Sequence, residues 1–233
     1  METRKSTRAT ANEITQLFMG NPRAGKRALE EILEINPELF AECVPQVFDK
    51  QTSLYAKDYF ENELLPYMLK EARKKRVPLS YIMFDLDNFH DFNKQNGHVA
   101  GDKVLRIISY LLNASFRTKE RRIEQLQIEQ DNRKEDRRMN NDFDWISYLG
   151  RIGGGEEFGV ILYDCSEEDA KKAANRFLER VRNCDSNVTV SGGVAEYHKF
   201  IGERRLRKRA DKALYYSKNT GKNRVTRYSQ VPE

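Results

Sequence analysis

The sequence predicts an α/β protein in which short buried strands alternate with amphipathic helices. Hydrophobic residues make up 39% of the 233-residue chain, which is enough to build one core. From Asp49 onward, apolar runs of strand length alternate with segments of helical periodicity. No apolar run approaches the roughly 18 residues of a membrane span, and the N-terminus lacks the apolar stretch of a secretory signal. A membrane-spanning or secreted class is therefore not expected.

Residues 1–47 are predicted to form a separate helical segment. Apolar residues recur at nearly helical spacing over 22–45, and Asn36-Pro37 interrupts them, which predicts two helices with a break. The segment can dock on the main domain, dimerise the chain or bind a partner, and the sequence does not choose among these.

Residues 48–233 are predicted to form the main domain. An apolar stripe over 59–76 predicts a helix in which Pro66 marks a kink or a shifted start. The apolar run 79–84, which ends in Asp85, predicts a buried strand. The remaining elements are predicted as a helix (101–114), two strands (145–149 and 158–163), a helix (167–183), a strand (188–194), a helix (206–218) and a closing strand (224–228).

Residues 116–142 are predicted to be a charged insertion in this domain. Basic and acidic residues are nearly balanced there and large aliphatic side chains are few, which is typical of a solvated helix or arm. The basic run 199–209 is likewise interpreted as a solvated helix start, so we do not expect a nucleic-acid partner.

Charge and cysteine usage give weaker indications. The chain has 41 basic and 36 acidic residues, a formal net charge of +5, which favours an anionic partner only slightly. Its 3 cysteines are widely separated and form no CxxC motif, so neither a disulfide framework nor a zinc site is expected. A reducing, cytoplasmic location is predicted.

Two acidic motifs carry the candidate chemistry. The sequence FDLD places Asp85 at the tip of the predicted strand 79–84, where carboxylate oxygens suit Mg²⁺. The sequence RIGGGEEF places Glu156 and Glu157 after a glycine turn, where they can complete a metal site begun by Asp85. Each motif alone is a weak signal, because acidic loops and glycine turns are common.

Five motifs in order resemble those of the GGDEF family, the diguanylate cyclases. The motifs are DKQTSLYAKDYF (49–60), FDLDNFHDFNKQNGHVAGD (84–102), RIGGGEEF (151–158), SGGVA (191–195) and ADKALYYSKNTGKN (210–223). The resemblance implies a palm-like fold with a central, mainly antiparallel five-stranded sheet flanked by helices. It also implies an enzyme that condenses two GTP into cyclic di-GMP and two pyrophosphates, with Mg²⁺ or alternatively Mn²⁺, at the interface of a homodimer.

The resemblance assigns roles residue by residue. It implies metal ligation by Asp85, the Leu86 carbonyl and Glu156, with Glu156 as catalytic base and Glu157 as the second candidate. Asn93 and Asp102 are expected to read the guanine edge, and His98 to line the nucleotide pocket, although a packing role for His98 is equally compatible. The expected phosphate-binding residues are His90, Lys218 and Lys222, the two lysines one helical turn apart.

Two departures from the family pattern keep an alternative open. His90 stands where the family usually has lysine, which places less positive charge near the phosphates. The glycine turn has one glycine more than usual, and we expect a bulge to absorb it so that Glu156 keeps its place. The alternative is a degenerate module that binds GTP or cyclic di-GMP and signals through a regulatory partner at 1–47 or 116–142. Synthesis of a different cyclic dinucleotide is disfavoured by Asp102.

Overall fold

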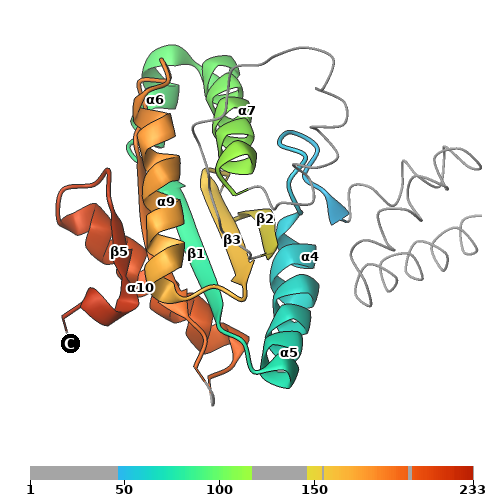
Figure 1. The fold of residues 1–233 in the computed structure, drawn as a ribbon. Helices are drawn as coiled ribbons and strands as arrows, with labels where there is room; N and C mark the ends of the chain where they lie inside the picture. The colour runs from blue at the N-terminus through green and yellow to red at the C-terminus, as the bar shows by residue number, and fades with distance from the viewer. Residues whose placement is uncertain (1–46, 117–145, 154, 199–200, 233) are drawn as a thin grey trace, which may run out of the picture.

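A five-stranded sheet forms the centre of the domain (Figure 1). The structure, a computed structural model, describes residues 47–116, 146–153, 155–198 and 201–232. The strand order is β2-β3-β1-β4-β5, and neighbours are antiparallel except β4 and β5, which are parallel. The predicted α/β class with a mainly antiparallel sheet is confirmed. The strands are β1 (Leu79–Leu86), β2 (Ile146–Ile152), β3 (Glu157–Tyr163), β4 (Val190–Glu196) and β5 (Val225–Arg227).

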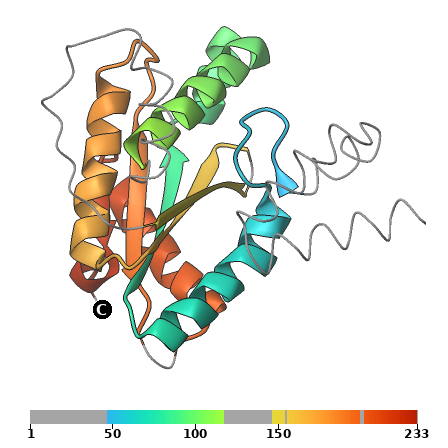
Figure 2. The same cartoon turned by 45° about the vertical axis from the view of Figure 1, so that its right-hand side comes forward.

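Helices cover both faces of the sheet (Figure 2). One buried cluster joins the sheet to α7 and α9, and a second joins it to α5 and α10. The helical elements are α4 (Lys57–Tyr59), the π-helical turn η1 (Phe60–Leu64), α5 (Leu65–Lys75), α6 (Phe89–Asn96), α7 (His98–Ser115), α9 (Glu167–Arg182), α10 (Glu203–Asn219) and the 3₁₀ turn η2 (Tyr228–Gln230).

The central strand β1 has core on both sides. Ile82 and Phe84 belong to the cluster with α7 and α9, whereas Leu79 and Tyr81 belong to the cluster with α5 and α10. Because successive side chains of a strand point to opposite faces, a strand covered on both faces reads as a continuous apolar run. This is why the sequence predicts β1 so clearly.

The structure changes some predicted boundaries. The strand predicted over 79–84 continues to Leu86, so Asp85 lies inside the sheet rather than beyond its end. Helix α6 was not predicted, because it is short and polar. It begins after Asn88, which has left-handed backbone, and ends before Gly97, which has a positive φ of 79°. Residues 1–46 of the predicted N-terminal segment and 117–142 of the predicted insertion lie outside the described residues.

Pro66 is accommodated by a change of helical pitch, not by a break. In the turn η1 the Leu65 N–H donates to the Phe60 carbonyl, five residues back, and the proline then sits in the first turn of α5. The same turn places the Phe60 ring against Gly150 and Gly159, where an added Cβ would lie 2.4 and 2.5 Å from ring carbons. The two glycines are cross-strand partners of β2 and β3, so this contact seats α4 and η1 on the sheet.

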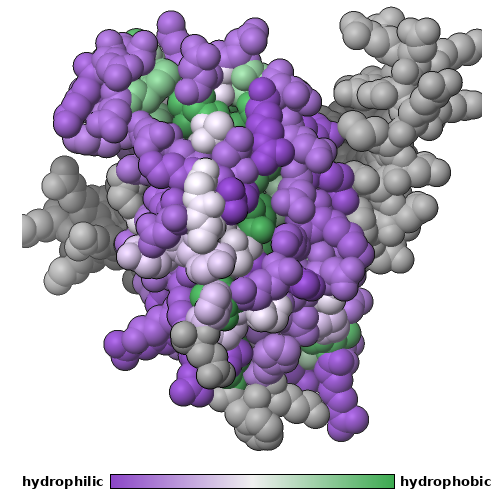
Figure 3. Space-filling view, turned by 90° about the vertical axis from the view of Figure 1, so that its left-hand side faces the viewer, coloured by the Kyte–Doolittle hydropathy of each residue, from purple (hydrophilic) through white to green (hydrophobic). Residues whose placement is uncertain are grey.

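The outer surface is mostly polar. Figure 3 shows the side of the domain that carries β5, which is predominantly hydrophilic with small scattered hydrophobic areas. Within the described residues, no helix combines the length and the apolar character required to cross a bilayer. Part of the predicted basic run is used internally, since Arg207 Nη1 lies 2.7 Å from Glu61 Oε2 and Arg209 stacks on the Tyr228 ring.

Candidate active site

Asp85 is fixed near the C-terminal end of β1 by pairing on both sides. It lies opposite Glu157 of β3 and Ser191 of β4 in the antiparallel ladders. On the α10 side of the sheet, the Lys218 Nζ atom lies 2.6 Å from Asp85 Oδ1. Strand pairing and helix packing therefore bring together four residues that are far apart in the sequence.

The environment of the Asp85 carboxylate disfavours its ionised form. Burial raises its pKa above the ordinary value, and the nearby charges of Glu156 and Asp87 add to this rise. The ion pair with Lys218 opposes the rise, because a positive charge favours the ionised carboxylate. Negative charge is thus concentrated at this end of β1 and only partly neutralised.

Glu157 belongs to the same charged cluster. Burial raises the pKa of its carboxyl group, and the charge of Asp85 raises it further. Its side chain folds over Gly153, where an added Cβ would lie 1.4 Å from Glu157 Oε2. The Glu157 side chain can move away from such an atom, but Gly153 has a φ of 65°, and this left-handed backbone favours glycine.

The additional glycine lies in the turn between β2 and β3. We expected a bulge to absorb this glycine, but the described ladder runs without interruption to the pair Ile152–Glu157, so the extra residue is accommodated in the turn. Gly153 and Gly155 adopt positive φ values of 65° and 110° and reverse the chain there. The two glutamates then separate: Glu157 stays opposite Asp85, and Glu156 lines a neighbouring pocket.

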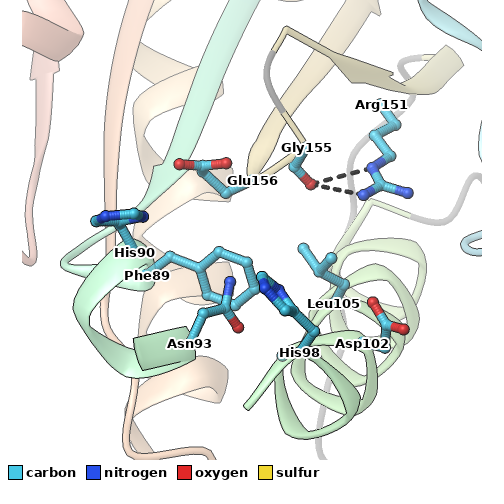
Figure 4. A pocket seen from close by; sticks show the side chains of 10 residues that line it. Phe89, His90, Asn93, His98, Asp102, Leu105, Arg151, Gly155 and Glu156 are labelled. Atoms are coloured by element: carbon cyan, nitrogen blue, oxygen red, sulfur yellow. Dashed lines mark hydrogen bonds between the residues drawn. The ribbon is translucent and has the colours of Figure 1, made fainter. Parts of the chain in front are cut away.

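The pocket lies between α6, α7 and the β2–β3 turn (Figure 4). It has a volume of about 320 Å³, within the range of small-molecule sites. Five of the predicted site residues meet in it, although they come from three separate elements. Its lining residues are Phe89, His90, Asn93, His98, Gly101, Asp102, Leu105, Arg151, Gly155 and Glu156.

Asn93 packs against the backbone of α7 inside this pocket. An added Cβ at Gly101 would lie only 1.9 Å from Asn93 Oδ1, so the absence of a side chain at Gly101 allows the amide to sit where it does. The buried Asn93 Oδ1 has no hydrogen-bond partner among the described residues. Buried polar atoms are normally paired, so this amide has capacity for a ligand.

The other predicted residues lie beside the pocket. Leu86 is the last residue of β1, and its N–H points to the Glu156 carbonyl at 3.4 Å. The expectation that Lys218 and Lys222 lie one helical turn apart is wrong, because α10 ends at Asn219. Lys222 has left-handed backbone beyond the helix and hydrogen-bonds Asn88 Oδ1.

Two functional features were not assigned from the sequence. Asp87, the second acid of FDLD, is only 4% exposed and accepts hydrogen bonds from Thr189, Ser191 and the Asn223 N–H. It therefore ties β4 and the α10–β5 turn to β1. Arg151 donates through Nε and Nη2 to the Gly155 carbonyl at 3.0 and 2.9 Å, which holds the β2–β3 turn. The signal that could have identified Asp87 and Arg151 was their position inside the motifs FDLD and RIGGGEEF.

The carboxylates of Asp85, Glu156 and Glu157 are the candidate ligands for the Mg²⁺ ion that the family resemblance implies. No group of three or more His, Cys, Asp or Glu side chains in the described ranges is gathered closely enough to hold a metal ion. The donor type nevertheless fits, because Asp85, Glu156 and Glu157 supply carboxylate oxygens, which Mg²⁺ prefers. Burial is the main cause of the raised pKa values of Asp85 and Glu157, and the charges of neighbouring carboxylates raise both further.

The fold and the site together define an α/β domain whose acidic pocket lies at one end of a mostly antiparallel sheet. The chain belongs to the GGDEF family: the family described as "Diguanylate cyclase, GGDEF domain" matches residues 46–125 and 139–224.

The relatives are consistent with this assignment. The chain is 28% identical to the probable diguanylate cyclase DgcT of Escherichia coli and 30% identical to diguanylate cyclase A of Treponema denticola. Each match covers 76% of this chain but only 34% and 43% of the relatives, so the chain spans less than half of their length. The GGDEF domain of DgcB from Caulobacter crescentus, solved in complex with c-di-GMP, superposes with a TM-score of 0.63 at 24% identity, covering 79% of this chain and 94% of that domain.

Proposed function

We propose that this chain is a diguanylate cyclase that condenses two GTP into cyclic di-GMP and two pyrophosphates. The observation that carries the proposal is the pocket that joins Asn93 and Asp102 to Glu156, next to the carboxylate cluster at Asp85. The residues proposed to bind the base therefore lie next to the acidic residues. This arrangement suits a reaction at the sugar and α-phosphate of a nucleotide whose base is bound in the pocket.

Base recognition is assigned to Asn93 and Asp102, with His98 against the nucleotide. The Asp102 carboxylate accepts from N1–H and the exocyclic amine of guanine, a donor pair that adenine lacks. A site built on such hydrogen bonds discriminates strongly, because the wrong base leaves its polar groups unpaired.

The chemistry is assigned to the acidic cluster. Glu156, with Glu157 as second candidate, removes the proton from the 3′-hydroxyl; the 3′-oxygen then bonds to the α-phosphorus of the other GTP and pyrophosphate leaves. Asp85, the Leu86 carbonyl and Glu156 would hold Mg²⁺ or Mn²⁺, which would lower the pKa of the attacking hydroxyl and stabilise the leaving group. His90, Lys218 and Lys222 are assigned to the phosphates.

The reaction requires two copies of the chain. Each domain binds one GTP, and each 3′-hydroxyl attacks the other nucleotide, so we propose a homodimer with the pockets facing each other. We assign a regulatory partner to 1–47 or 116–142, and a cytoplasmic location agrees with the free thiols of Cys165 and Cys184.

The test is direct. The full chain is incubated with GTP and Mg²⁺ at high protein concentration, and the products are identified by mass spectrometry. We expect cyclic di-GMP from the native chain and none from Glu156→Ala. If the native chain binds GTP but makes no product, the degenerate binding module, which the His90 and turn-glycine departures favour, replaces the enzyme.

Gly101→Ala should separate binding from stability. The added Cβ would displace the Asn93 amide, and we expect roughly tenfold weaker GTP binding, measured by calorimetry. The free energy of unfolding should stay the same or rise by up to about 1 kcal/mol, because alanine favours a helix interior more than glycine. Asn93→Ala should cause a similar loss, and the double variant should lose no more than either single one. An additive loss would contradict the contact.

A further inference from the structure

Two side-chain hydrogen bonds connect Arg151 of β2 to Asp102 of α7 through Gln51. Arg151 Nη1 donates to Gln51 Oε1 at 2.6 Å, and Gln51 Nε2 donates to Asp102 Oδ1 at 2.7 Å. The orientation of the Gln51 amide follows from chemistry, because arginine only donates and an ionised carboxylate only accepts. Gln51 is therefore the link between two residues that line the pocket.

The Arg151 end of this link is firmly anchored. The guanidinium also donates to the Gly155 carbonyl and to Asp49 Oδ1, the latter at 3.1 Å. Figure 4 shows Arg151 bonded to Gly155 on the same side of the pocket as Asp102. The exposed Asp102 side chain is thus held, through Gln51, to a part of the structure with several independent contacts.

We propose that Gln51 is a positioning residue that sets the purine selectivity of this site through Asp102; the inference rests on the proposed function. The Gln51 amide N–H donates a hydrogen bond to one lone pair of Asp102 Oδ1 and so fixes the plane of the Asp102 carboxylate. Its other acceptor sites then face the base in one orientation, so guanine meets a preorganised acceptor pair.

Two substitutions of Gln51 distinguish the hydrogen bond with Arg151 from the hydrogen bond with Asp102. Gln51→Met keeps the length of the side chain and removes both hydrogen bonds. Gln51→Glu keeps an acceptor for Arg151 but turns an oxygen, in place of the N–H donor, toward Asp102. The matched control is Gln230→Met, which removes a single exposed hydrogen bond with Lys171 away from the pocket.

The measurement is the affinity of the full chain for 3′-deoxy-GTP and 3′-deoxy-ATP with Mg²⁺, by calorimetry. Neither nucleotide has the attacking hydroxyl, so binding is read without turnover. The native chain should prefer the guanine nucleotide. Both Gln51 variants should lower that preference about three- to tenfold, through weaker guanine binding with adenine binding unchanged. Gln230→Met should leave the preference unchanged.

The outcomes distinguish this inference from the proposed function. A native preference that survives in both Gln51 variants, or an equal loss for both nucleotides, overturns the role of Gln51 and leaves the proposed function standing. A native chain without any preference for the guanine nucleotide overturns base reading by Asp102 and this inference with it. Melting temperatures report folding, and if Gln51→Met is unfolded, Gln51→Glu carries the test because it keeps the Arg151 contact.

Discussion

Asp85→Asn should abolish cyclic di-GMP synthesis and leave the fold intact. The proposed cation site loses a charged ligand, and metal stabilisation of the transition state amounts to several kcal/mol, so a rate loss of at least about a hundredfold is expected. The fold should tolerate the change because burial raises the pKa of Asp85, which means that its charge is disfavoured in the folded protein. Lys218 is partly exposed and can turn to solvent.

The rate of product formation and the unfolding free energy should be measured together. Asp185→Asn is the matched control, since it makes the same chemical change at an exposed position after α9. Its activity and stability should equal those of the native chain. Full synthesis by the Asp85 variant would refute the metal assignment, and a large loss of stability would show that Asp85 is mainly structural.

Gly193→Ala should destabilise the domain by about 3 kcal/mol. Strand β4 approaches α10 so closely that a Cβ at Gly193 would lie 2.1 Å from the Ala210 carbonyl oxygen and 2.2 Å from the Leu214 nitrogen. Both are backbone atoms, so strand and helix must separate, and overpacking of this kind is costly. Because α10 carries Lys218 toward Asp85, the same shift should also impair catalysis.

Urea unfolding of the purified variant provides the measurement. Gly202→Ala is the control: it adds the same methyl group at the start of α10, where no described atom lies within 4 Å. A loss of about 0.5–1 kcal/mol is expected there, from the weaker N-cap alone. Equal stability of the two variants would mean that α10 moves away from β4 at little cost.

The sequence by itself determined the elements whose patterns are local and strong. The run that forms β1 is apolar throughout because core covers both of its faces, and α9 and α10 have clear amphipathic stripes. Their predicted boundaries lie within a few residues of those observed. The resemblance of the five motifs to the family also implied roles in one nucleotide site for Asn93, His98, Asp102 and Glu156, and these residues meet in one pocket. Short-range periodicity suffices for the helices and strands, whereas the site assignment rested on the resemblance.

Tertiary structure alone decided which distant side chains meet. The order of the strands sets Asp85 opposite Glu157, and the packing of α10 brings Lys218 to it while the end of that helix leaves Lys222 elsewhere. Asp87 was given no role from the sequence, and the structure shows that it accepts hydrogen bonds from Ser191 of β4 and from the Asn223 N–H in the α10–β5 turn.

The hydrogen bonds of Gln51 show why the sequence alone does not reveal which distant side chains meet. Gln51, Asp102 and Arg151 lie in separate segments of the chain, and no local pattern relates one to another. Their hydrogen bonds exist only because the whole core fixes β2, α7 and the segment before α4 in one arrangement. Local sequence determines which surface each element buries; the joint packing of all of them determines which polar groups are then within 3 Å.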